Sequence, residues 1–167
     1  MSFRLRDILK EHYPVSSDFK RFSVGWYREK KLWKSIEPSR GKRWETAGFR
    51  PYMVIHTEGD YVYLILFTTS SFYFPCDKDK RYGIEGKTPC IDMSKCEIEL
   101  RDRCSSLRGE SKVFKRRLRK SCKIVLRIKK NLLKAGSYEC GRCTEEDIPQ
   151  LLKDIFRAEL KEWGLEV

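Results

Sequence analysis

The segment from Tyr61 to Thr68 constrains the fold of this chain more than any other. Its residues from Val62 to Phe67 are all apolar, and β-branched and aromatic side chains dominate it. A strand that is apolar on both faces has to be covered on both, so we expect a central strand here. A shorter apolar run, Tyr52 to His56, precedes it across the turn sequence Glu58-Gly59-Asp60. The two runs therefore predict a β-hairpin.

Later segments supply the rest of the pattern. Cys96 to Leu100 and Cys122 to Ile128 alternate between apolar and polar residues, as half-exposed strands do. Thr144 and Asp147 then have the spacing of a capping box. The residues that follow place apolar side chains at helical spacing, which predicts an amphipathic helix ending near Gly164.

The 167 residues have room for one domain, and no repeat or linker divides them. We expect a mainly β fold with flanking helices (α+β). A helical segment would cover 1–14, a strand-rich body about 22–143, and the closing helix 144–164. No stretch is apolar enough for a membrane helix or a secretory signal, so we expect a cytoplasmic protein that does not bind membranes.

The net charge of the chain lies in one segment. The formal charge is +12, and residues 101–134 hold 14 Lys or Arg against two acidic residues, which accounts for all of it. Such a basic insertion favours a nucleic-acid partner, although a solvated face or a charge-protected edge strand would have the same composition. The predicted contacts are Lys115, Arg116, Arg117, Arg119, Lys123 and Arg127.

Seven cysteines leave at least one thiol unpaired if all bonds are internal. Cys140-Gly-Arg-Cys143 has the spacing of zinc ligands or of a redox pair, but no second pair completes a zinc ribbon. We favour a structural role, either a disulfide between Cys140 and Cys143 or plain packing, over zinc or redox chemistry. One Gln, one Asn and 36% charged residues are typical of hyperthermophiles, whose intracellular proteins can keep disulfides.

The two histidines, His12 and His56, are interpreted as packing or surface residues, because nothing in the sequence brings them together for catalysis. The chain has no Gly-rich phosphate loop and no HExxH motif. Nucleotide hydrolysis and zinc proteolysis are therefore not expected, and neither is a metal or other cofactor.

A group of residues around the hairpin carries a family resemblance. Glu45 precedes Gly48-Phe49-Arg50-Pro51 and the first apolar strand, and the second strand ends in Phe67-Thr68-Thr69-Ser70. This arrangement resembles the PemK/MazF-type toxin endoribonucleases, over about 45–70 and more weakly through the closing helix. The resemblance implies a small SH3-like β-barrel closed by a C-terminal helix.

The resemblance also implies an activity. Such a protein would cleave single-stranded RNA without metal, by attack of a ribose 2′-hydroxyl on the adjacent phosphate, and it would form a homodimer and bind an acidic antitoxin. Arg50 would stabilise the charge that develops on the phosphate, and Thr68 would bind the same phosphate. Glu45 would accept the proton or orient Arg50.

Two other functions fit the same residues. One is a non-catalytic nucleic-acid-binding β-barrel that uses the basic insertion and exposed aromatic side chains. The other is a basic module that binds an acidic protein partner. Cleavage of RNA in the presence of EDTA separates the first function from both alternatives.

Overall fold

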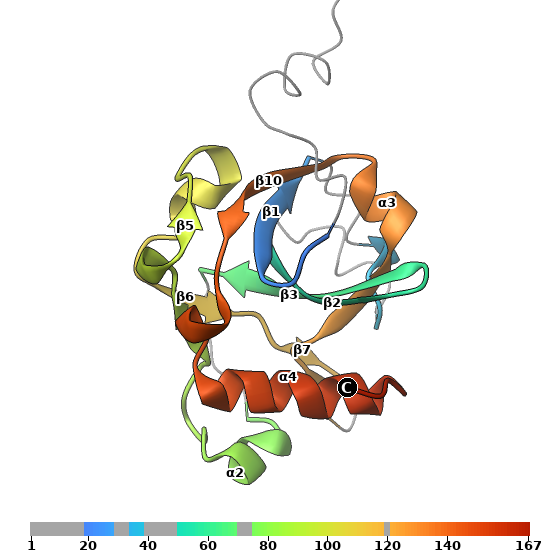
Figure 1. Cartoon of the computed structure of the whole chain (residues 1–167). Helices are drawn as coiled ribbons and strands as arrows, with labels where there is room; N and C mark the ends of the chain where they lie inside the picture. The colour runs from blue at the N-terminus through green and yellow to red at the C-terminus, as the bar shows by residue number, and fades with distance from the viewer. Residues whose placement is uncertain (1–18, 29–33, 39–49, 70–74, 119–120) are drawn as a thin grey trace, which may run out of the picture.

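The computed structural model describes residues 19–28, 34–38, 50–69, 75–118 and 121–167; the helical segment predicted over 1–14 lies outside them. The described chain is mainly antiparallel β-sheet with three α-helices, an α+β fold as expected (Figure 1). The strands are β1 (Ser23–Tyr27), β2 (Tyr52–Glu58), β3 (Tyr61–Thr68), β4 (Cys90–Asp92), β5 (Glu97–Ile98), β6 (Glu110–Val113), β7 (Arg116–Arg117), β8 (Cys122–Lys123), β9 (Leu126–Lys129) and β10 (Ser137–Arg142). The helices are α2 (Lys78–Tyr82), α3 (Lys130–Lys134) and α4 (Gln150–Glu162), with short 3-10 turns η3 (Met93–Lys95), η4 (Asp102–Ser106) and η5 (Glu145–Asp147).

The large sheet follows the order β4-β6-β3-β2-β1-β10-β5, with β9 paired to β3 beside this path. One edge of β3 serves two partners: Tyr61 to Leu64 pair with β9, and Phe67 and Thr68 pair with β6. Among the described strands no pairing joins β4 to β5, so the sheet is open and the predicted closed barrel is wrong. Closure needs pairing around the whole ring, and the two end strands have only three and two residues.

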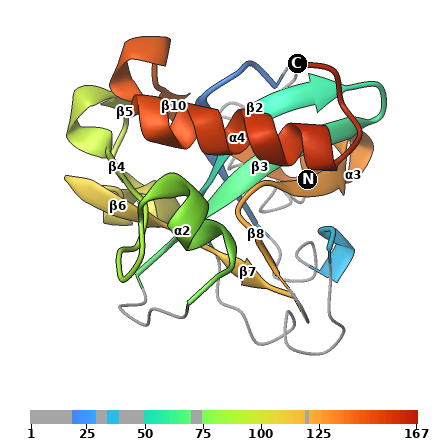
Figure 2. The same ribbon diagram turned by 90° about the horizontal axis from the view of Figure 1, so that it is seen from below.

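The predicted hairpin is confirmed as β2 and β3, and both faces of β3 are covered as expected. We call the core that includes Leu152, Ile155 and Phe156 of α4 the helix-side core, and the one that includes Leu126, Ile128 and Leu133 the α3-side core. Alternate residues of β3 enter the two cores: Tyr63, Ile65 and Phe67 the first, and Val62, Leu64 and Leu66 the second. Figure 2 shows α4 lying across β2 and β3.

The closing helix is confirmed, but it begins later than predicted. Thr144 and Asp147 form the predicted capping box, with the Thr144 amide donating to Asp147 Oδ2 at 2.7 Å. The box caps the short turn η5, and α4 starts only at Gln150, after Pro149. Pro cannot donate a backbone hydrogen bond, so it suits the position just before a new helix. No helix in the described ranges is long and apolar enough to cross a membrane.

The strand predicted over 122–128 is interrupted between β8 and β9. The amides of Ile124 and Val125 donate to Oε1 of Glu159 on α4, at 2.8 and 2.9 Å, instead of to a neighbouring strand. Glu159 is 1% exposed, and burial raises its pKa to about 7. Its other oxygen lies 3.9 Å from Nζ of Lys78, on α2. A buried carboxylate thus joins α4 to the gap in the strand.

Three disulfides join segments far apart in the chain: Cys76–Cys122, Cys96–Cys143 and Cys104–Cys140. Cys90 is the free thiol. The predicted disulfide between Cys140 and Cys143 is therefore wrong. Cys140 lies in the extended strand β10 and Cys143 directly after it, and three residues of strand span about 10 Å. The Cα atoms of a disulfide approach to about 7 Å or less.

Stability should depend on pH through Glu159. Because its folded-state pKa is raised above the ordinary 4.5, its stabilising contribution is complete below that value and is lost as the pH rises through 7. This group should lower the free energy of unfolding by up to about 3 kcal/mol between pH 4.5 and 8. Glu159→Gln, which keeps an acceptor oxygen and cannot ionise, should lack this fall in guanidinium titrations. Glu166→Gln, at an exposed position, is the matched control, and equal pH slopes in wild type and E159Q would contradict the assignment.

The disulfide pattern predicts the products of proteolysis without reduction. Peptides containing Cys104 and Cys140 should be linked to each other, as should those containing Cys96 and Cys143. Mass spectrometry before and after reduction measures this directly. A peptide with an internal bond between Cys140 and Cys143 would overturn the pairing.

Candidate functional site

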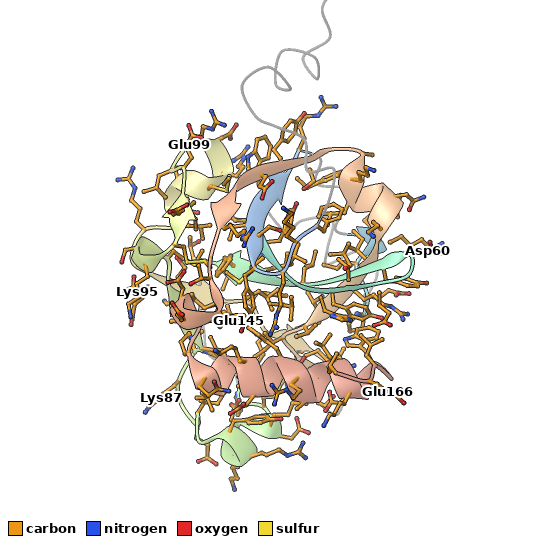
Figure 3. The ribbon with its side chains drawn as sticks, in the orientation of Figure 1. Asp60, Lys87, Lys95, Glu99, Glu145 and Glu166 are labelled. Atoms are coloured by element: carbon orange, nitrogen blue, oxygen red, sulfur yellow. A yellow bond between two sulfur atoms is a disulfide. The ribbon has the colours of Figure 1, made fainter. Side chains whose placement is uncertain are left out.

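The open end of the hairpin brings two predicted site residues together. Tyr52 pairs with Leu66, and the Phe67 amide donates to the Pro51 carbonyl at 3.0 Å. Continuing this register by one step sets Arg50 opposite Thr68. The extended conformation that a residue adopts before proline keeps Arg50 in line with the strand. Asp60, in the turn of the hairpin, lies at the other end of the two strands (Figure 3).

Strand β6 adds a second cation to this pair. Thr68 is paired with Lys112, and side chains of directly paired residues lie on the same face of a sheet, about 5 Å apart. Arg50, Thr68 and Lys112 therefore form one row across three neighbouring segments, which we call the cationic row. A hydroxyl stands between two positive charges in this row.

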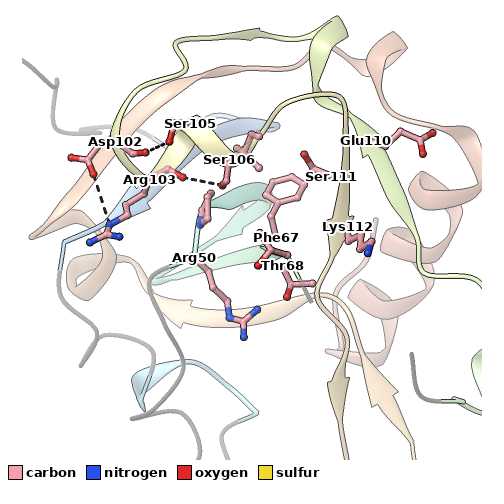
Figure 4. A pocket seen from close by; sticks show the side chains of 13 residues that line it. Arg50, Phe67, Thr68, Asp102, Arg103, Ser105, Ser106, Glu110, Ser111 and Lys112 are labelled. Carbon is pink, nitrogen blue, oxygen red and sulfur yellow. Dashed lines mark hydrogen bonds and ion pairs between the residues drawn. The ribbon is translucent and has the colours of Figure 1, made fainter. Parts of the chain in front are cut away.

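The cationic row borders a cavity of about 670 Å³ whose other wall comes from η4 (Figure 4). In that view Arg50 and Thr68 point in the same direction, and η4 lies across the cavity from them. The lining residues are Arg50, Pro51, Phe67, Thr68, Thr69, Asp102, Arg103, Ser105, Ser106, Leu107, Glu110, Ser111 and Lys112. Three cations and two carboxylates line the cavity with four serine or threonine hydroxyls beyond Thr68.

Arg50 lacks the compensation that a half-buried charge usually has. Its guanidinium stacks on the Phe114 ring, 4.7 Å from the centroid, and burial lowers its pKa. Among the described residues no carboxylate forms an ion pair with Arg50, and its Nε is buried without a hydrogen-bond partner. Ser111, only 8% exposed, also lines the cavity and has a buried Oγ without a described partner. Both atoms are shielded from solvent, so on Arg50 a bound anion would meet the terminal guanidinium nitrogens, which form no hydrogen bond or ion pair among the described residues.

The carboxylates of the cavity differ in their surroundings. Asp102 lies 3.8 Å from Nε of Arg103, and its carbonyl accepts a hydrogen bond from the Ser105 hydroxyl at 2.6 Å. Glu110 is exposed at the start of β6. Of the two, Glu110 is the carboxylate without a described ion pair, and it stands two residues from Lys112.

Several side chains of the predicted basic surface have partners inside the protein. Lys115 is 7% exposed, and its Nζ lies 3.0 Å from Oδ1 of the buried Asp79. Arg127 donates through Nε to Glu37 at 2.6 Å and lies over the Tyr61 ring. These contacts give both cations a role in holding the fold together.

The remaining predicted contacts are divided. Lys123 lies 4.0 Å from the centroid of the Trp163 ring, and burial lowers its pKa. Arg116 is buried, and Arg117 is exposed in the β7–β8 hairpin. Arg119 lies outside the described residues. The basic insertion thus does not present all its charges on one surface, and the nucleic-acid contacts predicted for these residues stay predictions.

Of the remaining residues singled out in the sequence, His56 lies away from the cavity, and His12 and Glu45 lie outside the described residues. Nε2 of His56 lies 2.7 Å from Oε2 of Glu58, near the hairpin turn. The proposed proton acceptor, Glu45, is not placed.

Two groups of three potential metal ligands occur in the described chain: Cys76, Asp77 and Cys122, and Cys96, Cys143 and Asp147. Each contains a disulfide pair. A thiolate, rather than a disulfide sulfur, is the metal ligand, so the oxidised protein offers one carboxylate at each place.

The sequence prediction missed the contribution of 102–112 to the site. The density of Lys and Arg is lower there than at 115–120, and the RNA contacts were predicted from this density alone. The signal that existed was Cys104 within the serine-rich segment Cys104-Ser105-Ser106, but its partner could not be read from spacing.

Comparison of the chain with family models, curated proteins and solved structures finds no match. The resemblance to the toxin endoribonucleases therefore stays a prediction that rests on the residues around Arg50 and Thr68.

Proposed function

We propose that the cavity beside the cationic row binds the phosphodiester backbone of single-stranded RNA. The observation that carries this proposal is the half-buried guanidinium of Arg50, which has no described carboxylate partner and stands in a row with Thr68 and Lys112. An anion is the ligand that would compensate such a charge.

The chemistry of the cationic row suits a phosphate in particular. Arg offers a planar fork of donors that matches two phosphate oxygens. The Thr68 hydroxyl and the Lys112 ammonium can reach oxygens on the same face. A cavity of about 670 Å³ has the size of a small-molecule site, which suits a nucleotide or two of a single strand and not a duplex.

Arg50→Ala should weaken binding of single-stranded RNA about tenfold or more at low salt, since it removes a charge-assisted hydrogen bond. The slope of log affinity against log salt should flatten by about 0.7 for each phosphate that the variant no longer neutralises. Fluorescence anisotropy with a 2′-O-methylated oligonucleotide, which cannot be cut, measures both quantities.

Arg157→Ala is the matched control for net charge, because Arg157 is exposed on α4 and does not line the cavity. Arg50→Lys keeps the charge and loses the fork, so we expect an affinity between those of wild type and R50A. Equal losses in R50A and R157A would show that only the overall charge matters, and the cavity would then not be the binding site.

Cleavage of the bound RNA is a second candidate function. The observation that favours it is the placement of Arg50 opposite Thr68, the two residues to which the family resemblance assigns phosphate contacts. Attack of the 2′-hydroxyl on the neighbouring phosphate forms a new P–O bond and expels the 5′-oxygen of the next nucleotide. The strand then ends in a 2′,3′-cyclic phosphate.

This reaction needs charge stabilisation and proton transfer. Arg50 and Thr68 would bind the phosphate oxygens as negative charge develops on them. Glu45 is the proton acceptor that the resemblance implies, and Glu110 is the carboxylate that the cavity itself offers. Only Glu110 belongs to the described wall of the cavity, whereas Glu45 lies outside the described residues.

Wild-type protein should cut an unmodified single-stranded RNA in EDTA and leave 2′,3′-cyclic ends. Removing a hydrogen bond made to the developing charge, as in R50A, should lower the rate by about 100-fold or more. Glu45→Gln and Glu110→Gln, measured in parallel, should identify the proton acceptor by the larger loss. Gel electrophoresis and end-group analysis give the readout.

An R50A preparation purified identically controls for contaminating nuclease. RNA that is bound and left intact by wild type would reject cleavage and keep the binding function. Displacement of RNA by polyglutamate at concentrations at which unlabelled RNA competes would favour an acidic protein partner.

A further inference from the structure

The wall opposite the cationic row depends on a short element. Of the lining residues, Asp102, Arg103, Ser105 and Ser106 belong to η4. A single 3-10 turn has few hydrogen bonds of its own and is stable only when packing or a covalent bond holds it. In this turn the Ser105 and Ser106 hydroxyls donate to backbone carbonyls of Asp102 and Arg103.

The covalent bond comes from the centre of the turn. Cys104 is 0% exposed and is bonded to Cys140, in β10. β10 is a well-held strand, because it pairs with β1 on one side and with β5 on the other. A side chain at Gly141 would collide with the Glu97 carbonyl, which shows how closely β5 packs on it.

The backbone at the start of the wall is itself unfavourable. Asp102 has a φ of 48°, in the left-handed region that residues other than glycine rarely adopt. Such a conformation persists only where its surroundings impose it. Two features hold the backbone of Asp102 in this conformation. One is the disulfide at Cys104, two residues later, and the other is the buried side chain of Leu107.

We infer that the Cys104–Cys140 disulfide positions the η4 wall, and with it Arg103, at the side of the cavity, where Arg103 can meet a phosphate next to the one held by the cationic row. The row belongs to the β2–β3–β6 part of the sheet and the wall is tied to β10. The disulfide therefore sets the distance between the two sides of the cavity. This inference rests on the proposed RNA-binding function and adds a covalent positioning device to it.

The chain offers a matched control for the loss of a disulfide. Cys76–Cys122 closes a sequence separation of 46 residues, and Cys104–Cys140 one of 36. Loop entropy depends only weakly on such a difference, so removing either bond should destabilise the protein to a similar extent. Neither Cys76 nor Cys122 lies next to a lining residue in the sequence.

The test compares Cys104→Ala/Cys140→Ala with Cys76→Ala/Cys122→Ala. Affinity for a 2′-O-methylated RNA of about ten nucleotides is measured by anisotropy, and the folded fraction by circular dichroism. The first double variant should bind about tenfold more weakly than wild type, the loss expected for one charge-assisted hydrogen bond. The second should stay within about twofold, as expected for a change distant from the ligand.

A double-mutant cycle separates positioning from general destabilisation. Arg103→Ser should weaken binding in wild type and equally in the Cys76→Ala/Cys122→Ala protein. In the Cys104→Ala/Cys140→Ala protein it should cost much less, because the displaced wall no longer holds Arg103 where it can meet the neighbouring phosphate. If this variant is not folded in buffer, all proteins are measured in the same concentration of trimethylamine N-oxide, which favours the folded state.

Equal affinity of both double variants, or an undiminished effect of R103S without the Cys104–Cys140 bond, would overturn the inference. Its failure is distinguishable from that of the proposed function. If wild type binds the RNA and R50A binds it more weakly than R157A does, the binding site stands whatever the disulfide variants do. If wild type does not bind, the proposed function itself fails.

Discussion

The burial of β3 on both faces is the constraint on which the rest of the structure depends. Every side chain from Val62 to Phe67 is at most 3% exposed, and each contributes about 1.5–3 kcal/mol by leaving water. This strand needs cover from α4 on one face and, on the other, from Leu133 of α3 together with Tyr27 and Ile36. Its length also lets it hold β9 and β6 in sequence along one edge. The candidate site lies at the C-terminal end of β3, where Thr68 is only partly buried.

Charge is used in two ways in this protein. Lys115 and Asp79 form a buried pair, and Lys78 lies near the buried Glu159. Such pairs compensate each other, because an isolated ion in the interior is costly. The same physics makes Arg50 different: it is half-buried, rests on an aromatic ring and has no described carboxylate partner. Arg50 therefore differs from these other cations in being partly buried without a described carboxylate partner. The net charge of the chain does not reveal this difference.

The hairpin and the amphipathic helix could be predicted because their signals are local. Apolar periodicity and the turn after Glu58 define β2 and β3, and the capping pair Thr144–Asp147 marks the approach to α4. The open sheet could not be predicted in this way, since closure depends on which short strands find partners. The break after Lys123 was equally hidden, because the acceptor for the next two amides is a carboxylate more than thirty residues later.

For the candidate site, the sequence by itself determined that Arg50 and Thr68 stand at the same end of one hairpin, since register follows from the turn and the apolar pattern. Only the tertiary structure decided that Lys112 joins them, that η4 forms the opposite wall, and that Cys104 bonds to Cys140 and leaves Cys143 to Cys96. These relations link segments that are distant in the chain. Pairing of that kind is set by packing of the whole core, to which local spacing gives no access.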